Sequence, residues 1–169
     1  IAKYVKKHFQ TPVYYYISPK LWAWISYRIK SIKRYIDKMY TIFPFETEFY
    51  AQYNYPVTYV GNPTVDSIAR FHASKNNRNF REENKLDSRP IVALLAGSRR
   101  QEISKCLPTM VEMADKFPTF QFLVAAAPGI ERGYYNQFLT SSVKIVSDST
   151  YALLDQSYAA IVNSGTATL

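Results

Sequence analysis

Residues 91–103 read IVALLAGSRRQEI, so an apolar run ends in a Gly-Ser pair that two arginines follow. Gly97 allows a tight turn and close approach of a ligand to the backbone. We predict that Ser98 caps the next helix, with Glu102 as a loose match to a capping box. The N–H groups of a helix start favour an anion, and the Arg99 guanidinium can clamp phosphate oxygens. This corner therefore predicts phosphate binding; the alternative is an ordinary turn with surface arginines.

A second stretch near the end of the sequence has the same design. Residues 162–169 read VNSGTATL, where Ser164, Gly165 and Thr166 stand between an apolar run and an expected helix. Two helix starts at the carboxyl edge of one parallel sheet can face the same ligand. A diphosphate suits that arrangement, because its charge needs several donors. We therefore expect both corners to share one diphosphate-bearing ligand, although either corner alone is equally consistent with a simple N-cap.

The usual signatures of other chemistries do not occur. The sequence has no GxxxxGK, GxGxxG, CxxC or HExxH pattern, so neither a standard nucleotide loop nor a metal site is predicted, and no cofactor is expected. Cys106 is the only cysteine and reads as a small apolar filler on a helix, which leaves no disulfide. His8 and His72 stand alone and read as surface or hydrogen-bonded side chains.

Aromatic and basic residues gather in a third stretch. Residues 14–24 read YYYISPKLWAW, and a basic amphipathic helix with isoleucines at helical spacing follows over 24–34. Tryptophans on a loop beside lysine suit a membrane interface, where each basic residue contributes ~1 kcal/mol near an anionic surface. The residues predicted to face a membrane are Lys20, Trp22, Trp24 and Arg28. Alternatively, the tryptophans and isoleucines form core; both readings hold if isoleucine points inward and tryptophan outward.

The charge is uneven along the 169 residues, whose net charge is +8. Residues 1–60 carry nine Lys/Arg against three Asp/Glu, and residues 61–169 carry twelve against ten. A basic first third predicts an anionic partner, such as lipid head groups, nucleic acid or a charged metabolite. The 47% apolar content allows a buried core, and no apolar run is long enough to cross a membrane.

The elements that must position these stretches alternate between strand and helix. A polar segment at 66–90 reads as a linker with a helical portion and marks a domain boundary. Apolar strands that alternate with helices predict an α/β fold with parallel sheets. The expected strands are 13–17, 39–43, 57–61, 91–96, 120–126, 143–146 and 159–162; the expected helices are 24–34, 46–53, 100–116, 130–140, 150–155 and one starting near Thr166.

Five stretches, in this order and spacing, resemble the lipid-A-disaccharide synthase family: SPKLWAW, IFPFE, YVGNPTVD, LLAGSRRQEI and NSGTATL. The resemblance covers nearly the whole chain and implies the GT-B glycosyltransferase fold of two Rossmann-like domains. Residues 1–65 would form the C-terminal part of the N-terminal, acceptor- and membrane-side domain. Residues 66–169 would form the linker and the first half of the C-terminal, UDP-sugar donor-binding domain. We therefore expect a piece of a longer protein, inactive alone, with exposed core surface or pairing into a homo-oligomer.

The resemblance also implies a function in lipid A biosynthesis of Gram-negative bacteria. Such an enzyme joins UDP-2,3-diacylglucosamine to 2,3-diacylglucosamine 1-phosphate (lipid X) by inverting displacement, without a metal, as a peripheral protein at the cytoplasmic face of the inner membrane. On this analogy Arg99 is essential and contacts the donor phosphate. The general base and the ribose-binding acid would lie outside the chain. The implied donor-binding residues are Gly97, Ser98, Arg99, Ser164, Gly165 and Thr166.

Two alternatives remain at this point. Another UDP-sugar enzyme of the same fold, an N-acetylglucosaminyl transferase or a UDP-sugar epimerase, would carry a similar Gly-Ser-Arg turn. A basic nucleic-acid-binding module is suggested by charge and tyrosine content. Residues 61–169 are nearly neutral, however, and the aromatic residues fall largely in strand-like runs, so no nucleic-acid partner is expected.

Overall fold

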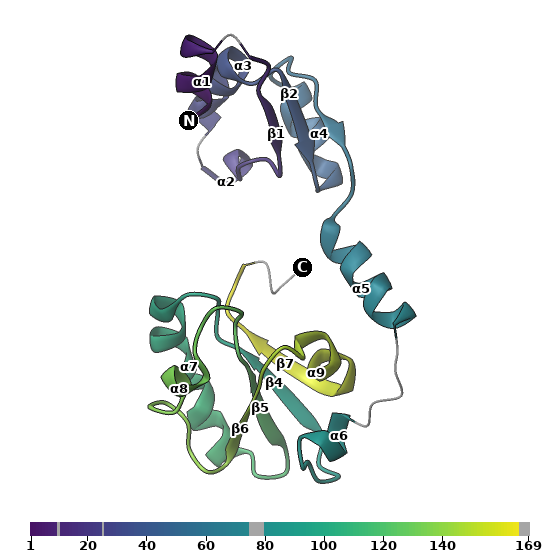
Figure 1. The fold of residues 1–169 in the computed structure, drawn as a ribbon, viewed down its shortest axis with the longest axis vertical. Coiled ribbons are helices and arrows are strands. Elements are labelled where there is room, and N and C mark those ends of the chain that lie inside the picture. Colours follow the sequence, from purple (N-terminus) through teal and green to yellow (C-terminus); the bar gives the residue numbers. More distant parts are fainter. Residues whose placement is uncertain (10, 25, 75–79, 166–169) are drawn as a thin grey trace. The chain divides into compact units, whose positions relative to one another are not determined.

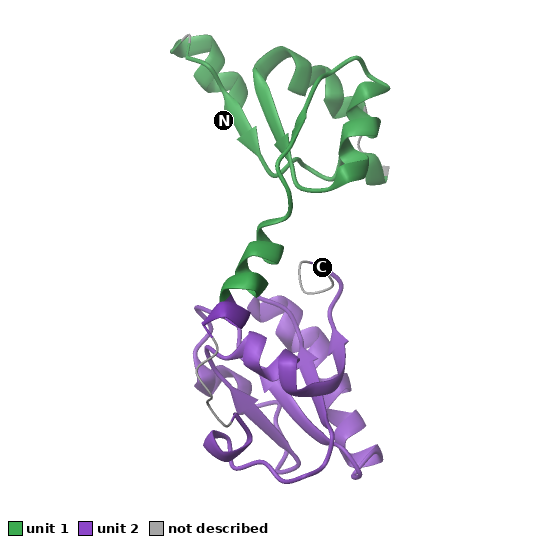
Figure 2. Ribbon diagram, turned by 90° about the vertical axis from the view of Figure 1, so that its right-hand side faces the viewer, with its two compact units in different colours: residues 1–70 green, residues 71–169 purple. Residues whose placement is uncertain are grey.

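The structure, a computed structural model, describes residues 1–9, 11–24, 26–74 and 80–165 (Figure 1). The chain divides into two compact units, residues 1–70 and 71–169 (Figure 2). Each unit contains its own parallel sheet and its own buried core. The division falls within helix α5 (Pro63–Ala73), which has no buried residue.

The first unit is built on three parallel strands in the order β1-β2-β3. The strands are β1 (Tyr14–Tyr16), β2 (Lys38–Thr41) and β3 (Thr58–Tyr59). Parallel neighbours need crossover connections, and helical segments supply them (Figure 1). The helical segments before α5 are α1 (Ala2–His8), α2 (Leu21–Trp24), the 3₁₀ turn η1 (Ser26–Arg28), α3 (Ile29–Tyr35) and α4 (Pro44–Ala51).

The isoleucine stripe of the basic helix forms the core of this unit. Ile29, Ile32 and Ile36 are buried, whereas Lys30 and the other basic side chains of α3 are exposed. This confirms the prediction that the isoleucines of this amphipathic segment point into the core, because the apolar stripe packs inward and leaves the charged side chains in water. Residue 25, also assigned to the stripe, lies outside the described residues. The stripe packs with Leu21, Met39, Tyr50 and Tyr55.

The second unit is a four-stranded parallel sheet in the order β6-β5-β4-β7. The strands are β4 (Ile91–Leu95), β5 (Gln121–Ala125), β6 (Val143–Val146) and β7 (Ser157–Val162). The helices are α6 (Phe80–Glu83), α7 (Arg100–Lys116), α8 (Arg132–Tyr135) and α9 (Thr150–Gln156). The predicted alternation of strand and helix in an α/β fold with parallel sheets is confirmed.

Strand β4 is buried on both faces, which explains its unbroken apolar sequence. Val92 and Leu94 belong to the core cluster that α7 and Tyr135 of α8 cover. Ile91 and Ala93 belong to the cluster on the other face, with residues from α6 and α9. Figure 1 shows α7 and α8 on one side of the sheet and α9 on the other. Such two-sided burial is typical of parallel sheets.

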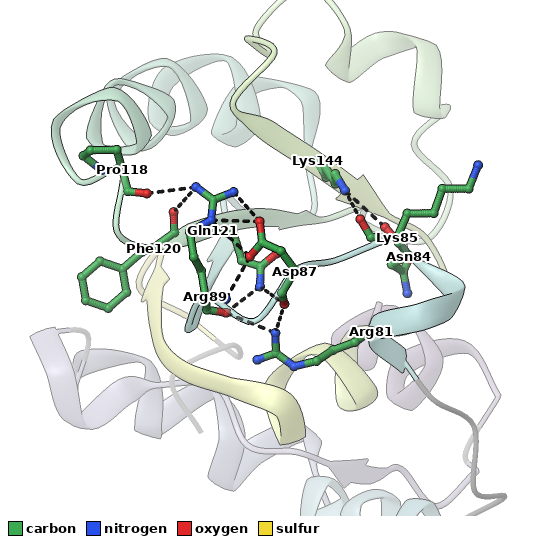
Figure 3. A network of polar contacts seen from close by, with 9 residues as sticks. All are labelled: Arg81, Asn84, Lys85, Asp87, Arg89, Pro118, Phe120, Gln121 and Lys144. Atoms are coloured by element: carbon green, nitrogen blue, oxygen red, sulfur yellow. Dashed lines mark hydrogen bonds and ion pairs between the residues drawn. The ribbon is translucent and has the colours of Figure 1, made fainter.

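A polar network ties part of the predicted linker to the amino ends of β4 and β5 (Figure 3). The Gln121 side chain, 6% exposed, donates to the carbonyls of Asp87 and Arg89 over 3.1 and 2.6 Å. Arg81 Nη1 donates to the same two carbonyls over 2.5 and 3.1 Å. Lys144 Nζ donates to the carbonyl of Lys85. Hydrogen bonds therefore hold the later part of the expected linker, residues 81–89, against the sheet of the second unit.

Several expected boundaries differ from the structure. α7 and β6 have the predicted bounds, but the helix expected at 130–140 is only the single turn α8. The tryptophans were expected on a loop, whereas Trp22 and Trp24 lie in α2. α1 was not anticipated. The helix expected near Thr166 lies outside the described residues.

The helix expected at 46–53 begins two residues earlier, at Pro44. Proline costs nothing at the first helical position, where its missing N–H would have no partner. Glu46 reaches back and accepts a hydrogen bond from the main-chain N–H of Phe43 over 3.0 Å. Pro44 therefore starts α4 in addition to following the end of β2.

Candidate functional site

The two glycine corners of the second unit lie at one edge of its sheet. Strands β4 and β7 are parallel neighbours, and Leu95 stands opposite Val162. The next pairing is a hydrogen bond from the main-chain N–H of Asn163 to the carbonyl of Leu95 over 2.8 Å. The two segments that follow β4 and β7 then turn, at Gly97 and Gly165. The two corners therefore lie close together at the carboxyl edge of the sheet.

A cavity of about 460 Å³ opens between these corners. It lies at the carboxyl ends of β4, β5 and β7, the edge at which open α/β sheets bind ligands. Its lining comprises Leu95, Gly97, Ser98, Arg99, Glu102, Ala125, Ala126, Ala127, Pro128, Thr150, Asn163, Ser164 and Gly165. The predicted residues of both corners line this single cavity, except Thr166, which lies outside the described residues.

Only glycine fits at position 97. Its φ is +118°, a conformation that side-chain-bearing residues rarely adopt. A Cβ there would lie 2.6 Å from Glu102 Oε2 and 3.1 Å from Asn163 Nδ2. The turn therefore brings the backbone against two polar side chains of the cavity, one from each corner.

The sequence predicted Ser98 as the N-cap of α7, but in the structure the N-cap is Arg99. Helix α7 begins one residue later than a Ser98 cap requires, which places Glu102 at its third position. From there Glu102 Oε2 accepts hydrogen bonds from the main-chain N–H groups of Ser98 and Arg99 over 2.9 and 3.2 Å. These two N–H groups are thus engaged by a carboxylate of the chain itself.

The two arginines of the corner have different surroundings. Arg99 lines the cavity, its side chain is 80% exposed, and its Nη1 lies 3.2 Å from Glu102 Oε1. Arg100 packs its guanidinium over the ring of Tyr134, 5.0 Å from the ring centre, and is not part of the cavity lining. Arg99 is therefore the arginine of this pair that can meet an anion in the cavity.

Sequence reasoning missed several contributors to the lining. Ala127 and Pro128 follow β5 at the same edge, and Thr150 begins α9. The Pro128-Gly129 pair directly after an apolar strand was the available signal for the first two, since it marks a turn at a strand end. Asn163 stood within the quoted VNSGTATL stretch, but nothing in the sequence indicated that it approaches Gly97.

In the first unit, the SPKLWAW and IFPFE stretches come together. The Ser18 hydroxyl donates to Glu46 Oε1, and Glu46 is 1% exposed. Glu46 Oε2 also accepts from the main-chain N–H groups of Ile42 and Phe43 over 3.2 and 3.0 Å. Three donors on one buried carboxylate fix the turns that follow β1 and β2.

An aromatic patch, which we define as Trp22, Phe45 and the half-buried Phe43, lies beside this buried carboxylate. The Trp22 ring meets the Phe45 ring edge-on, with their centroids 5.1 Å apart. The Phe45 ring stacks on that of Phe43, with a centroid distance of 5.5 Å. Trp22 is 41% and Phe45 45% exposed. Lys20 and Arg28 are exposed as well, and Trp24 belongs to α2. The rings thus present apolar surface to solvent.

The described residues contain neither a membrane-spanning helix nor a cluster of metal-ligating side chains. In that part of the chain, no helix has the length and apolar character needed to cross a bilayer. Nor do three or more His, Cys, Asp or Glu side chains gather there in a way that could hold a metal ion. Cys106 is half-buried against the α7 side of the core, and His8 stacks on Tyr4.

Comparisons with known proteins place the chain in a family. A family model described as Lipid-A-disaccharide synthetase matches residues 1–169. The lipid-A-disaccharide synthase of Coxiella burnetii (strain Dugway 5J108-111) is 38% identical over 173 residues, covering 100% of this chain and 45% of the relative. Lipid-A-disaccharide synthase 1 of Legionella pneumophila (strain Lens) is 39% identical over 179 residues, with 100% and 45% covered. The lipid-A-disaccharide synthase of Koribacter versatilis (strain Ellin345) is 38% identical, with 94% and 42% covered.

The fold defines the chain as an α/β protein with a parallel sheet in each of its two units. More specifically, the chain belongs to the lipid-A-disaccharide synthase family. It spans less than half the length of the relatives named above. The match decides for this family over the other UDP-sugar enzymes and the nucleic-acid-binding module that the sequence had left open.

Proposed function

We propose that the protein containing this chain is a lipid-A-disaccharide synthase. It joins UDP-2,3-diacylglucosamine to 2,3-diacylglucosamine 1-phosphate and releases UDP. The observation that carries this proposal is the single cavity shared by the Gly97 and Gly165 corners, in a chain that belongs to this family. The cavity takes the UDP-sugar donor, with its diphosphate between the two corners.

The reaction is a direct displacement that inverts the anomeric centre. A hydroxyl oxygen of the acceptor forms a bond to the anomeric carbon of the donor while the bond from that carbon to the diphosphate oxygen breaks. The hydroxyl proton passes to a base that the family resemblance assigns to a residue outside this chain. Negative charge grows on the departing UDP, so donors preorganised around the diphosphate lower the barrier.

Arg99 is the residue of the cavity that can neutralise this charge. Its guanidinium is largely exposed, and only one of its nitrogens is engaged within the described part of the chain, by Glu102. The remaining N–H groups can form charge-assisted hydrogen bonds to phosphate oxygens. Ser164 and the main chain of Gly165 face the same cavity from the second corner.

The first unit serves the acylated acceptor and the membrane. Both substrates carry acyl chains and phosphate, so they present apolar and anionic groups side by side. The aromatic patch offers apolar surface, and residues 1–60, with nine Lys/Arg against three Asp/Glu, offer positive charge. The protein thereby works as a peripheral enzyme at the cytoplasmic face of the inner membrane.

The test is Arg99→Ala in the intact synthase, compared with Arg100→Ala, in an assay that follows UDP release. Loss of a charge-assisted phosphate contact should cost at least ~2–4 kcal/mol of transition-state stabilisation. Arg100→Ala is the matched control, because Arg100 packs on Tyr134 outside the cavity. Near-normal turnover of Arg99→Ala, or an equal loss in both variants, contradicts the assignment of the donor site.

A further inference from the structure

The Glu102 carboxylate contacts both the backbone and the side chain of Arg99. Its Oε2 accepts from the main-chain N–H groups of Ser98 and Arg99, and its Oε1 lies 3.2 Å from Arg99 Nη1. The same oxygen, Oε2, would be 2.6 Å from a Cβ at position 97, so the glycine makes room for it. Glu102 therefore sits at the centre of the first corner and lines the cavity itself.

In this ion pair, main-chain hydrogen bonds hold the Glu102 side chain in place, whereas the Arg99 side chain is held by Glu102 alone within the described residues. The carboxylate is fixed by two main-chain donors, and its side chain is 31% exposed. The Arg99 side chain is 80% exposed and makes no hydrogen bond other than that to Glu102 within the described residues. An arginine without this partner would sample many rotamers, and binding a ligand would have to restrict them.

We propose that Glu102 is a positioning residue for the donor diphosphate, which acts by holding the Arg99 guanidinium at the edge of the cavity. This inference rests on the proposed function. Glu102 also occupies the N–H groups of Ser98 and Arg99, so the guanidinium and the second corner bind the diphosphate in their place. The carboxylate charge, which alone would repel a diphosphate, is offset by the arginine that it holds.

The proposal separates two roles of one side chain. In Glu102→Gln the amide oxygen still accepts from the main-chain N–H groups, but the amide carries no charge to hold Arg99. The intact synthase with this substitution should therefore keep its melting temperature while losing donor affinity. We expect kcat/KM for the UDP-sugar donor to fall about tenfold, mainly through a higher KM. Glu112→Gln is the matched control, because Glu112 is exposed on the same helix and does not line the cavity.

A double substitution tests whether Glu102 acts through Arg99. If it does, Arg99→Ala with Glu102→Gln is no slower than Arg99→Ala alone. Independent, multiplying losses overturn the proposal, as does a kcat/KM in Glu102→Gln equal to or above that of the parent enzyme. A Glu102→Gln protein that no longer folds, or melts well below the parent, assigns the carboxylate to the scaffold and overturns it too.

The outcomes also distinguish this inference from the proposed function. Full turnover in Arg99→Ala rejects the donor site, whatever Glu102→Gln does. Lost turnover in Arg99→Ala together with normal kinetics in Glu102→Gln rejects the positioning role alone.

Discussion

The main-chain N–H of Asn163 donates to the carbonyl of Leu95 over 2.8 Å, one step beyond the last paired residues of β4 and β7. This bond sets the geometry of the site. Gly97 lies two residues after Leu95, and Gly165 lies two residues after Asn163. Because Leu95 stands opposite Val162, the two corners leave the sheet one residue apart in register, and the cavity forms between them.

Gly97→Ala should disturb this arrangement directly. The added Cβ would lie 2.6 Å from Glu102 Oε2, at a φ of +118° that alanine rarely adopts. We expect a loss of ~1–3 kcal/mol in the free energy of unfolding, measured by denaturant titration, together with weaker UDP binding. A protein as stable as its parent would show that the corner relaxes without cost.

Gly133→Ala is the control for that substitution. Gly133 lies in α8, and a Cβ there would meet nothing within 4 Å. Because alanine is a better helix former than glycine, the free energy of unfolding should stay level or rise by up to about 1 kcal/mol.

The aromatic patch should carry membrane attachment. Trp22→Ser with Phe45→Ser removes two exposed rings that contact each other at 5.1 Å. We expect binding of the intact protein to anionic lipid vesicles, measured by co-sedimentation, to weaken at least about tenfold, because less apolar area enters the interface. Affinity for UDP should not change. Tyr4→Ser removes an exposed ring from α1 and should leave vesicle binding as it was.

The buried Glu46 carboxylate should stabilise the first unit. Glu46→Ala leaves the Ser18 hydroxyl and the N–H groups of Ile42 and Phe43 without their acceptor. The free energy of unfolding should fall by roughly 1–3 kcal/mol, as measured in urea. Glu48→Ala, on the exposed face of the same helix, should stay within about 0.5 kcal/mol of the parent. Equal effects at both positions would contradict this role of Glu46.

Asp87 should make stability depend on acid pH. Its carboxylate accepts from Arg89 Nε, 2.9 Å from Oδ2, and from the Arg89 main-chain N–H, and these bonds lower its pKa below the ordinary 3.8 (Figure 3). In this pH range the unfolded chain binds more protons than the folded one. The contribution of Asp87 is therefore complete above the ordinary pKa and is lost as pH falls through the lowered value.

The measurement is a series of thermal unfolding curves between about pH 5 and pH 2. The melting temperature of Asp87→Asn should fall less steeply with acid than that of the parent protein. The pKa of Asp37 is lowered as well, mainly by its hydrogen bond with Lys6, but Asp37 is present in both proteins and cancels in the comparison. If the melting temperatures of the two proteins fall equally with decreasing pH, Asp87 does not contribute to the pH dependence of stability.

Much of the second unit could be predicted from the sequence, because its signals are local. The apolar runs of β4 and β6 and the period of α7 each reflect burial along one segment, and α7 and β6 have the predicted bounds. The cap of α7 could not be assigned correctly. Ser98 and Arg99 differ by one residue, and the choice depends on where the Glu102 carboxylate packs against Gly97.

By itself the sequence determined the α/β class, the alternation of strand and helix and the two glycine corners, because each of these follows from residue type and spacing along a short stretch of chain. The family was indicated by the resemblance of five stretches spread over nearly the whole chain. Only the tertiary structure decided that β7 pairs with β4, and therefore that Asn163, Ser164 and Gly165 stand beside Arg99 and Glu102. Strand order is set by packing and hydrogen bonds between segments more than sixty residues apart, and no local pattern specifies it.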